Sequence, residues 1–140
     1  MKRLIISLVL LFTVSANAQV KKEEPYQTLF YNMGFSATHS VQQYNDGSIW
    51  IQFQNLEFKE ISDLEILKIG SDIDNAIITY TEMLNSLGLA NGNYELTNGL
   101  EVNKSGNTLL IRSGDKPTDG WTRITKGQCK KAIKKLQELK

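Results

Sequence analysis

The chain lacks the residues on which most metal and redox sites depend. Its 140 residues contain one cysteine, Cys129, and one histidine, His39. A single cysteine excludes an internal disulfide and a cysteine-rich zinc cluster, and a single histidine excludes a multi-histidine metal site. We therefore expect no metal and no cofactor. Cys129 falls on the apolar face of a predicted helix, where a buried and unreactive thiol is expected.

The common catalytic and nucleotide-binding motifs are also missing. No GxGxxG or GxxxxGK[ST] string occurs, which excludes nucleotide binding by such a glycine-rich loop, and GxSxG is absent. A Ser-His-Asp relay would need His39, which lies in an alternating strand and is better explained as a structural residue. The sequence therefore favours a protein that is not an enzyme.

Carboxylates leave one enzymatic alternative. A glycosidase needs two carboxyl groups about 5 to 9 Å apart. If two candidates converged in a cleft, the chain would be a carboxylate-dependent exported hydrolase acting on glycans. The candidates are Glu57, Glu60, Asp63, Glu65, Glu95 and Glu101.

The most apolar segment, Leu4–Val14, is short. As a helix its 11 residues reach only about 16 Å, against a hydrocarbon core of about 30 Å. Lys2 and Arg3 precede it, and Ala16 and Ala18 follow it at positions suited to signal peptidase. This pattern predicts a secretory signal peptide over residues 1–18, with cleavage before Gln19. We expect a periplasmic or extracellular protein with no transmembrane span in the mature chain.

Neither sign of charge dominates the chain, but acidic and basic residues are segregated along it. The formal net charge is +1, so nothing global attracts nucleic acid. Residues 19–122 carry −7 and residues 123–140 carry +6. The C-terminal segment is thus either a solvated basic face, a partner of the acidic remainder, or a contact for an anionic partner. The candidate contact residues are Lys130, Lys131, Lys134 and Lys135.

Alternating apolar residues and turn signals predict several strands and two helices. We expect a flexible arm over residues 19–28 and one domain over residues 29–140. The predicted strands are 35–43, 48–54, 64–69, 100–102, 108–112 and 121–124, with hairpin turns at Asn45-Asp46-Gly47 and Lys104-Ser105-Gly106-Asn107. Ser71 is expected to cap the first helix, Gly88 to end it in the left-handed conformation, and Thr125 with Gln128 to form a capping box for the second.

This element order predicts an α+β fold. We expect a single domain with an antiparallel sheet, built from two hairpins plus extra strands, and two helices packed on one face. The order hairpin, strand, helix occurs twice, and Ala76-Ile77 aligns with Ala132-Ile133 at an offset of 56 residues. Two common residues match easily by chance, so this similarity favours coincidence over a true repeat.

Trp50 is the most specific candidate for a contact surface. It alternates with the apolar Ile49, Ile51 and Phe53, so it lies on the less apolar face of its strand. Either it is exposed and anchors a sugar or a protein, or the apolar cluster Leu29-Phe30-Tyr31 covers it. We therefore expect an exported binding or interaction protein, with another envelope or extracellular protein as the candidate partner.

Overall fold

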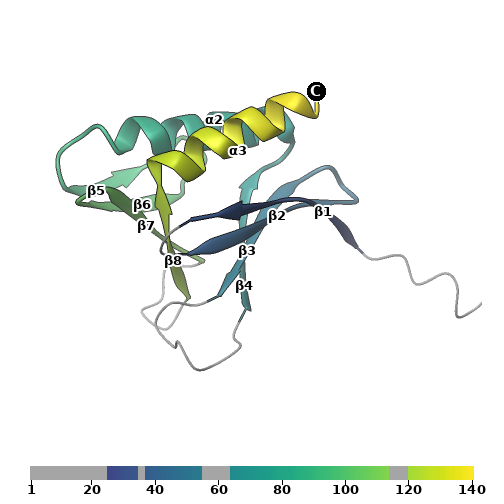
Figure 1. The fold of residues 1–140 in the computed structure, drawn as a ribbon, viewed down its shortest axis with the longest axis horizontal. Coiled ribbons are helices and arrows are strands. Elements are labelled where there is room, and N and C mark those ends of the chain that lie inside the picture. Colours follow the sequence, from purple (N-terminus) through teal and green to yellow (C-terminus); the bar gives the residue numbers. More distant parts are fainter. Residues whose placement is uncertain (1–24, 35–36, 55–63, 114–119) are drawn as a thin grey trace, which may run out of the picture.

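The structure is a computed structural model that describes residues 25–34, 37–54, 64–113 and 120–140. The predicted signal peptide lies outside these residues. In chain order the elements are β1 (Tyr26–Met33), β2 (Thr38–Tyr44), β3 (Ile49–Gln54), β4 (Leu64–Gly70), α2 (Ile73–Ser86), β5 (Gly92–Glu95), β6 (Glu101–Ser105), β7 (Thr108–Arg112), β8 (Trp121–Thr125) and α3 (Lys126–Glu138). Four strands followed by one helix thus occur twice (Figure 1). We call β1–α2 the first half and β5–α3 the second half.

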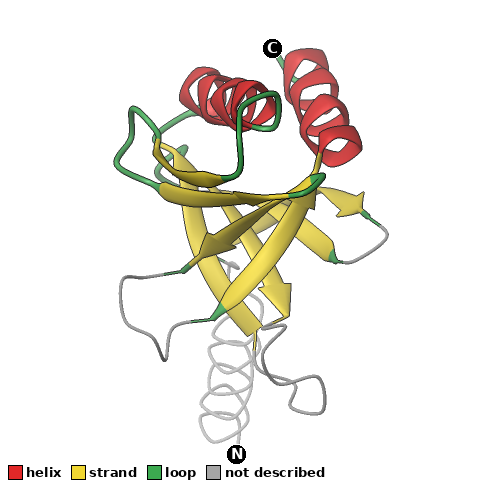
Figure 2. Cartoon of the chain, turned by 90° about the vertical axis from the view of Figure 1, so that its left-hand side faces the viewer, coloured by secondary structure: helices red, strands yellow, loops and turns green. Residues whose placement is uncertain are grey.

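The strands form two sheets, where the sequence predicted one. The orders are β1-β2-β3-β4 and β5-β6-β7-β8, and all neighbouring strands are antiparallel. Both helices lie on the same side of the sheets and contact each other (Figures 1 and 2). The α+β class is confirmed. No described helix has the length and apolar character needed to cross a membrane.

Local turn chemistry sets the two predicted hairpins. Between β2 and β3, Gly47 has φ +87° and its N–H donates to the Tyr44 carbonyl at 2.9 Å. The Asp46 carboxylate accepts the Ser48 N–H at 2.9 Å, which closes the turn. Between β6 and β7, Gly106 has φ +60°. Positive φ favours glycine at such positions, so these turns are encoded by the sequence.

The helix ends differ from the prediction in two places. Asp72, and not Ser71, caps α2, because its carboxylate accepts the Asn75 N–H at 2.8 Å. Gly88 does not adopt positive φ, and the C-cap Leu87 is right-handed. The α3 capping box of Thr125 and Gln128 is confirmed.

Strand β1 and strand β5 were not predicted as such. β1 begins at Tyr26, so the second part of the predicted arm is a strand, and Leu29 and Phe30 pack against the core. β5 contains Gly92 and Asn93, which are weak strand formers. The fully buried core joins both sheets and both helices; it includes Val41, Ile51, Phe53, Ile69, Tyr80, Met83, Leu109, Ile111, Ile124, Cys129 and Leu136.

Each half packs its first hairpin on the helix of the other half. The β1–β2 hairpin is joined to α3, where Asn32 Nδ2 donates to the Gln128 carbonyl at 3.0 Å. The β5–β6 turn is joined to α2, where the Thr97 N–H donates to the Glu82 carboxylate at 3.1 Å. The N-caps Asp72 and Thr125 lie 53 positions apart. The two helices therefore correspond at an offset of 53, which differs from the offset of 56 seen in the sequence.

Candidate functional site

Three aromatic side chains form a row on the first sheet. Because Ile49, Ile51 and Phe53 are buried, the alternate residues of β3 lie on the opposite face, which we call the outer face. There the ring centroids of Tyr44 and Trp50 are 5.4 Å apart, and those of Tyr26 and Tyr44 are 5.3 Å apart. These distances fit favourable aromatic contacts. We call Tyr26, Tyr44 and Trp50 the aromatic row.

The Trp50 ring is fixed by the adjacent turn. Its indole Nε1–H donates to Ser48 Oγ at 2.8 Å, and Ser48 Oγ donates to Asp46 Oδ1. The same hydrogen bonds from Ser48 hold the pKa of the Asp46 carboxyl below its usual value. Because the indole N–H is already used, Trp50 offers a partner only its ring faces and edges.

A hollow lies beside Tyr26 and Tyr44, at the end of this row away from Trp50. It has a volume of about 420 Å³ and is lined by Tyr26, Gln27, Gln43, Tyr44, Asn45 and Gly47. A Cβ added at Gly47 would meet nothing within 4 Å, so the rim of the hollow is open there. The register pairs Tyr26 with Tyr44 and Gln27 with Gln43, so the two tyrosine rings lie on the outer face and the two glutamine side chains on the opposite face at this end of the sheet.

Trp50 itself does not line the hollow. It is half-buried, and its ring contacts that of Tyr44. Sequence reasoning missed Tyr26 and Tyr44. The polar residues around Tyr26 predict a flexible arm and not a strand. Tyr44 lies on the same strand face as Gln42, which pairs with Trp50, so its spacing is a usable signal.

The four candidate lysines do not form one uniform surface. Lys131 Nζ donates to the Tyr31 carbonyl at 3.1 Å, and Lys135 forms an ion pair with Glu138 at 3.9 Å. Lys130 and Lys134 are exposed and have no hydrogen bond or ion pair with the part of the chain described. Among the described residues, one ion pair joins the basic C-terminal segment to the acidic remainder; it runs from Lys140, beyond the end of α3, to Asp74.

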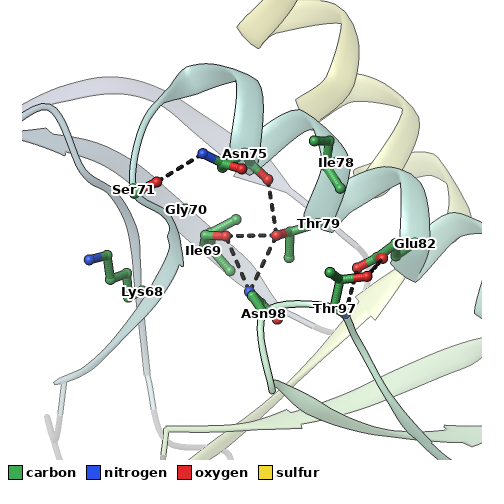
Figure 3. A pocket seen from close by; sticks show the side chains of 10 residues that line it. All are labelled: Lys68, Ile69, Gly70, Ser71, Asn75, Ile78, Thr79, Glu82, Thr97 and Asn98. Carbon is green, nitrogen blue, oxygen red and sulfur yellow. Dashed lines mark hydrogen bonds between the residues drawn. The ribbon is translucent and has the colours of Figure 1, made fainter.

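A second depression, the groove between β4, α2 and the β5–β6 turn, has a volume of about 480 Å³ (Figure 3). Its polar groups, apart from the exposed Lys68 ammonium group, bind one another. Thr79 Oγ1 donates to the Ile69 carbonyl at 2.8 Å, and Asn98 Nδ2 donates to Thr79 Oγ1 at 3.3 Å. Glu82 is occupied by Thr97. The groove is therefore explained as the seam that joins the second half to α2.

The candidate carboxylates that the structure describes do not assemble in either depression. Glu57, Glu60 and Asp63 lie outside the described residues. Glu65 accepts a hydrogen bond from Ser113 Oγ at 3.2 Å. Glu95 and Glu101 are paired across β5 and β6, but both are exposed, and neither lines the groove or the hollow.

The single cysteine and the single histidine are both buried. Cys129 is fully buried, and burial raises the pKa of its thiol to about 12, as expected for an unreactive cysteine. His39 is also fully buried, and burial lowers its pKa to about 4. His39 Nε2 lies 3.0 Å from Thr122 Oγ1, which links the two sheets. Among the residues described, no group of three or more His, Cys, Asp or Glu is placed to hold a metal ion.

Comparisons with known protein families, with curated proteins and with solved structures found no match for this chain.

Proposed function

We propose that this protein is an exported, non-enzymatic binding module whose contact surface is the aromatic row with its adjoining hollow. The observation that carries this proposal is the pre-arranged stack of Tyr26, Tyr44 and Trp50 beside an open depression. Rigid aromatic side chains bury a large area at low conformational cost when a ligand binds.

The surroundings of the row support a role in binding. Trp50 is held through Ser48 by the Asp46 turn, so its ring is ordered before any ligand arrives. Beside it, Gln42 Nε2 donates to Ser40 Oγ at 3.2 Å and to Gln52 Oε1 at 3.1 Å, which orders the amides of the outer face. Such order lowers the entropy lost on binding.

Export is part of the same proposal. It rests on the charged, apolar and small-residue pattern of residues 1–18. A contact surface on a secreted module would meet envelope or extracellular material. Mass spectrometry of the exported species should show a chain that starts at Gln19, and recovery of the full-length chain in membranes would contradict export.

The binding surface is tested by capture from the envelope and medium of the producing cells. The mature protein is immobilised, and the retained material is compared with that retained by Tyr44→Ala and Asn45→Ala. We expect each variant to retain at least tenfold less, since ring contact or amide contact is lost.

The matched control is Tyr31→Ala. Tyr31 is on β1, as Tyr26 is, and its side chain is 62% exposed, but it does not line the hollow. Its loss should leave capture unchanged. Equal capture by the wild type and by both hollow variants, all with unchanged melting midpoints, would show that the aromatic row is not the contact surface.

A further inference from the structure

We propose that two copies of this chain pair through β4 and join their first sheets into one antiparallel sheet. This inference goes beyond the proposed function, because it concerns the edge of the first sheet and not the aromatic row. Among the described strands, β4 pairs only with β3 and forms one edge of the sheet (Figure 1). An edge strand leaves a row of backbone N–H and C=O groups unpaired, to which another strand can bind.

The hydrogen bonding of the neighbouring strands shows which backbone groups of β4 face outward. The Tyr44 N–H donates to the Ser48 carbonyl at 2.9 Å. Because the direction of bonding alternates along an antiparallel strand, Trp50 also bonds toward β2. The residues of β3 that alternate with it, Ile51 and Phe53, therefore bond toward β4.

The β4 residues paired with this second set are Leu67 and Glu65, so their backbone groups bond to β3. The N–H and C=O groups of the alternate residues, Leu64, Ile66 and Lys68, face outward. None of these outward backbone groups has a hydrogen-bond partner among the described residues. We call the segment from Leu64 to Lys68 the open edge.

The other edge of this sheet is better protected. On β1 the outward carbonyl of Tyr31 accepts a hydrogen bond from Lys131 Nζ at 3.1 Å, and the register shifts between Thr28 and Phe30. Covering side chains and bulges of this kind prevent edge strands from pairing. The end of β4 is closed as well, since the Ile69 carbonyl accepts a hydrogen bond from α2 at 2.8 Å. Within the open edge, the pairing with β3 is regular.

A second copy fits the open edge through a twofold axis at Ile66. In this antiparallel register Ile66 lies opposite its own counterpart, and Leu64 lies opposite the counterpart of Lys68. Every outward N–H and C=O group then meets its complement, and no like charges lie opposite each other. Leu64 is 59% exposed and Ile66 is 43% exposed in the single chain, and the pairing would cover both. A strand of another protein would need a matching sequence, whereas a second copy already has one.

The pairing is expected to be weak and to make the binding surface bivalent. One strand from each copy buries less than the roughly 1,200 Å² of stable complexes, so we expect a Kd between about 10 µM and 1 mM. Lys68 pairs with Trp50, so the open edge and the aromatic row share the outer face. The twofold axis keeps both outer faces on one side of the joined sheet. A ligand with repeated units could then bind both copies.

The test is sedimentation equilibrium of the full mature protein between about 10 µM and 1 mM. We expect the wild type to approach the mass of a dimer at the highest concentration. Ile66→Lys and Ile66→Glu should each weaken association at least about tenfold, because each sets like charges opposite each other at the twofold axis. An equimolar mixture of these two variants should associate at least as strongly as the wild type, since opposite charges then meet.

The matched control is Ile78→Lys, which adds the same charge at an isoleucine that is 51% exposed on α2. It should leave the dissociation constant unchanged. Amide hydrogen exchange of the wild type needs no variant. The Ile66 N–H should gain protection as the concentration rises, while the Leu67 N–H should be protected at every concentration. A wild type that stays monomeric at about 1 mM, association that survives both Ile66 variants, or a mixture that fails to associate would overturn the pairing.

Discussion

Asn32 and Gln128 are joined by two hydrogen bonds across 96 positions of sequence: Asn32 Nδ2 donates to the Gln128 carbonyl at 3.0 Å, and Gln128 Nε2 donates to the Asn32 carbonyl at 3.1 Å. The same Nε2 also donates to the Ala37 carbonyl at 2.9 Å, and Gln128 Oε1 accepts the Thr125 N–H at 3.0 Å. One side chain thus caps α3 and holds the β1–β2 hairpin against it.

Gln128→Ala should destabilise the protein by about 2 to 4 kcal/mol, because it removes a capping contact and leaves buried carbonyl groups without a donor. The matched control is Gln137→Ala on the exposed face of the same helix, which should cost under about 0.5 kcal/mol. Urea unfolding measures both. Equal stability of the two variants would mean that Gln128 does not hold the hairpin.

What the sequence predicted correctly depends on residues that are close together along the chain. The turn at Gly47 and the Thr125–Gln128 capping box each lie within a few positions, and both are confirmed. The cap at Ser71 was wrong because Asp72 is an equally good capping residue one position later. The left-handed Gly88 was wrong because α2 ends at Ser86 and its C-cap, Leu87, is right-handed.

What the sequence could not predict depends on distant contacts. The division of the strands into two sheets follows from pairing partners, which turn residues do not specify. The aromatic row requires the register that places Tyr26 opposite Tyr44, and Tyr26 lies in a segment that is polar and contains a proline. The sequence identified Trp50 as a candidate, but it did not predict the hollow beside Tyr26 and Tyr44.

Acid should destabilise the protein through His39. Burial lowers its pKa from 6.5 to about 4, so between these values the unfolded chain binds more protons than the folded one. Stability therefore falls as the pH drops from about 6.5 to 4, by up to about 3 kcal/mol from this residue. In His39→Gln, which keeps an amide Nε2 near Thr122, that part of the pH dependence should vanish. If the urea midpoint depended on pH in the same way in both proteins, this assignment would be contradicted.

Tyr80→Phe should leave stability unchanged or raise it. The Tyr80 hydroxyl is fully buried and has no hydrogen-bond partner among the described residues, and burial raises its pKa. Removing an unsatisfied buried polar group relieves a desolvation penalty of about 1 to 3 kcal/mol. Tyr94→Phe is the comparison, since its hydroxyl donates to the Ala90 carbonyl at 2.6 Å and its loss should destabilise slightly. A thermal midpoint that falls for Tyr80→Phe would show that this hydroxyl has a partner.

The lysines of α3 should separate into two classes. Lys131→Gln should lower stability by about 0.5 to 1 kcal/mol, since its ammonium group donates to the Tyr31 carbonyl. The double variant Lys130→Gln/Lys134→Gln should unfold at the same urea concentration as the wild type or slightly higher, because a like-charge pair spaced by four residues is removed. If the double variant were less stable than Lys131→Gln, Lys131 would not be the lysine that makes the structural contact.

The most direct test of the binding surface is site-specific photocrosslinking in the cells that export the protein. Benzoylphenylalanine replaces Asn45, which lines the hollow, or Lys130, which is exposed on α3. If the aromatic row and its hollow form the contact surface, irradiation should yield a crosslinked product from position 45 and none from position 130. Crosslinking from position 130 alone would contradict the account and place the contact on the lysine-bearing helix.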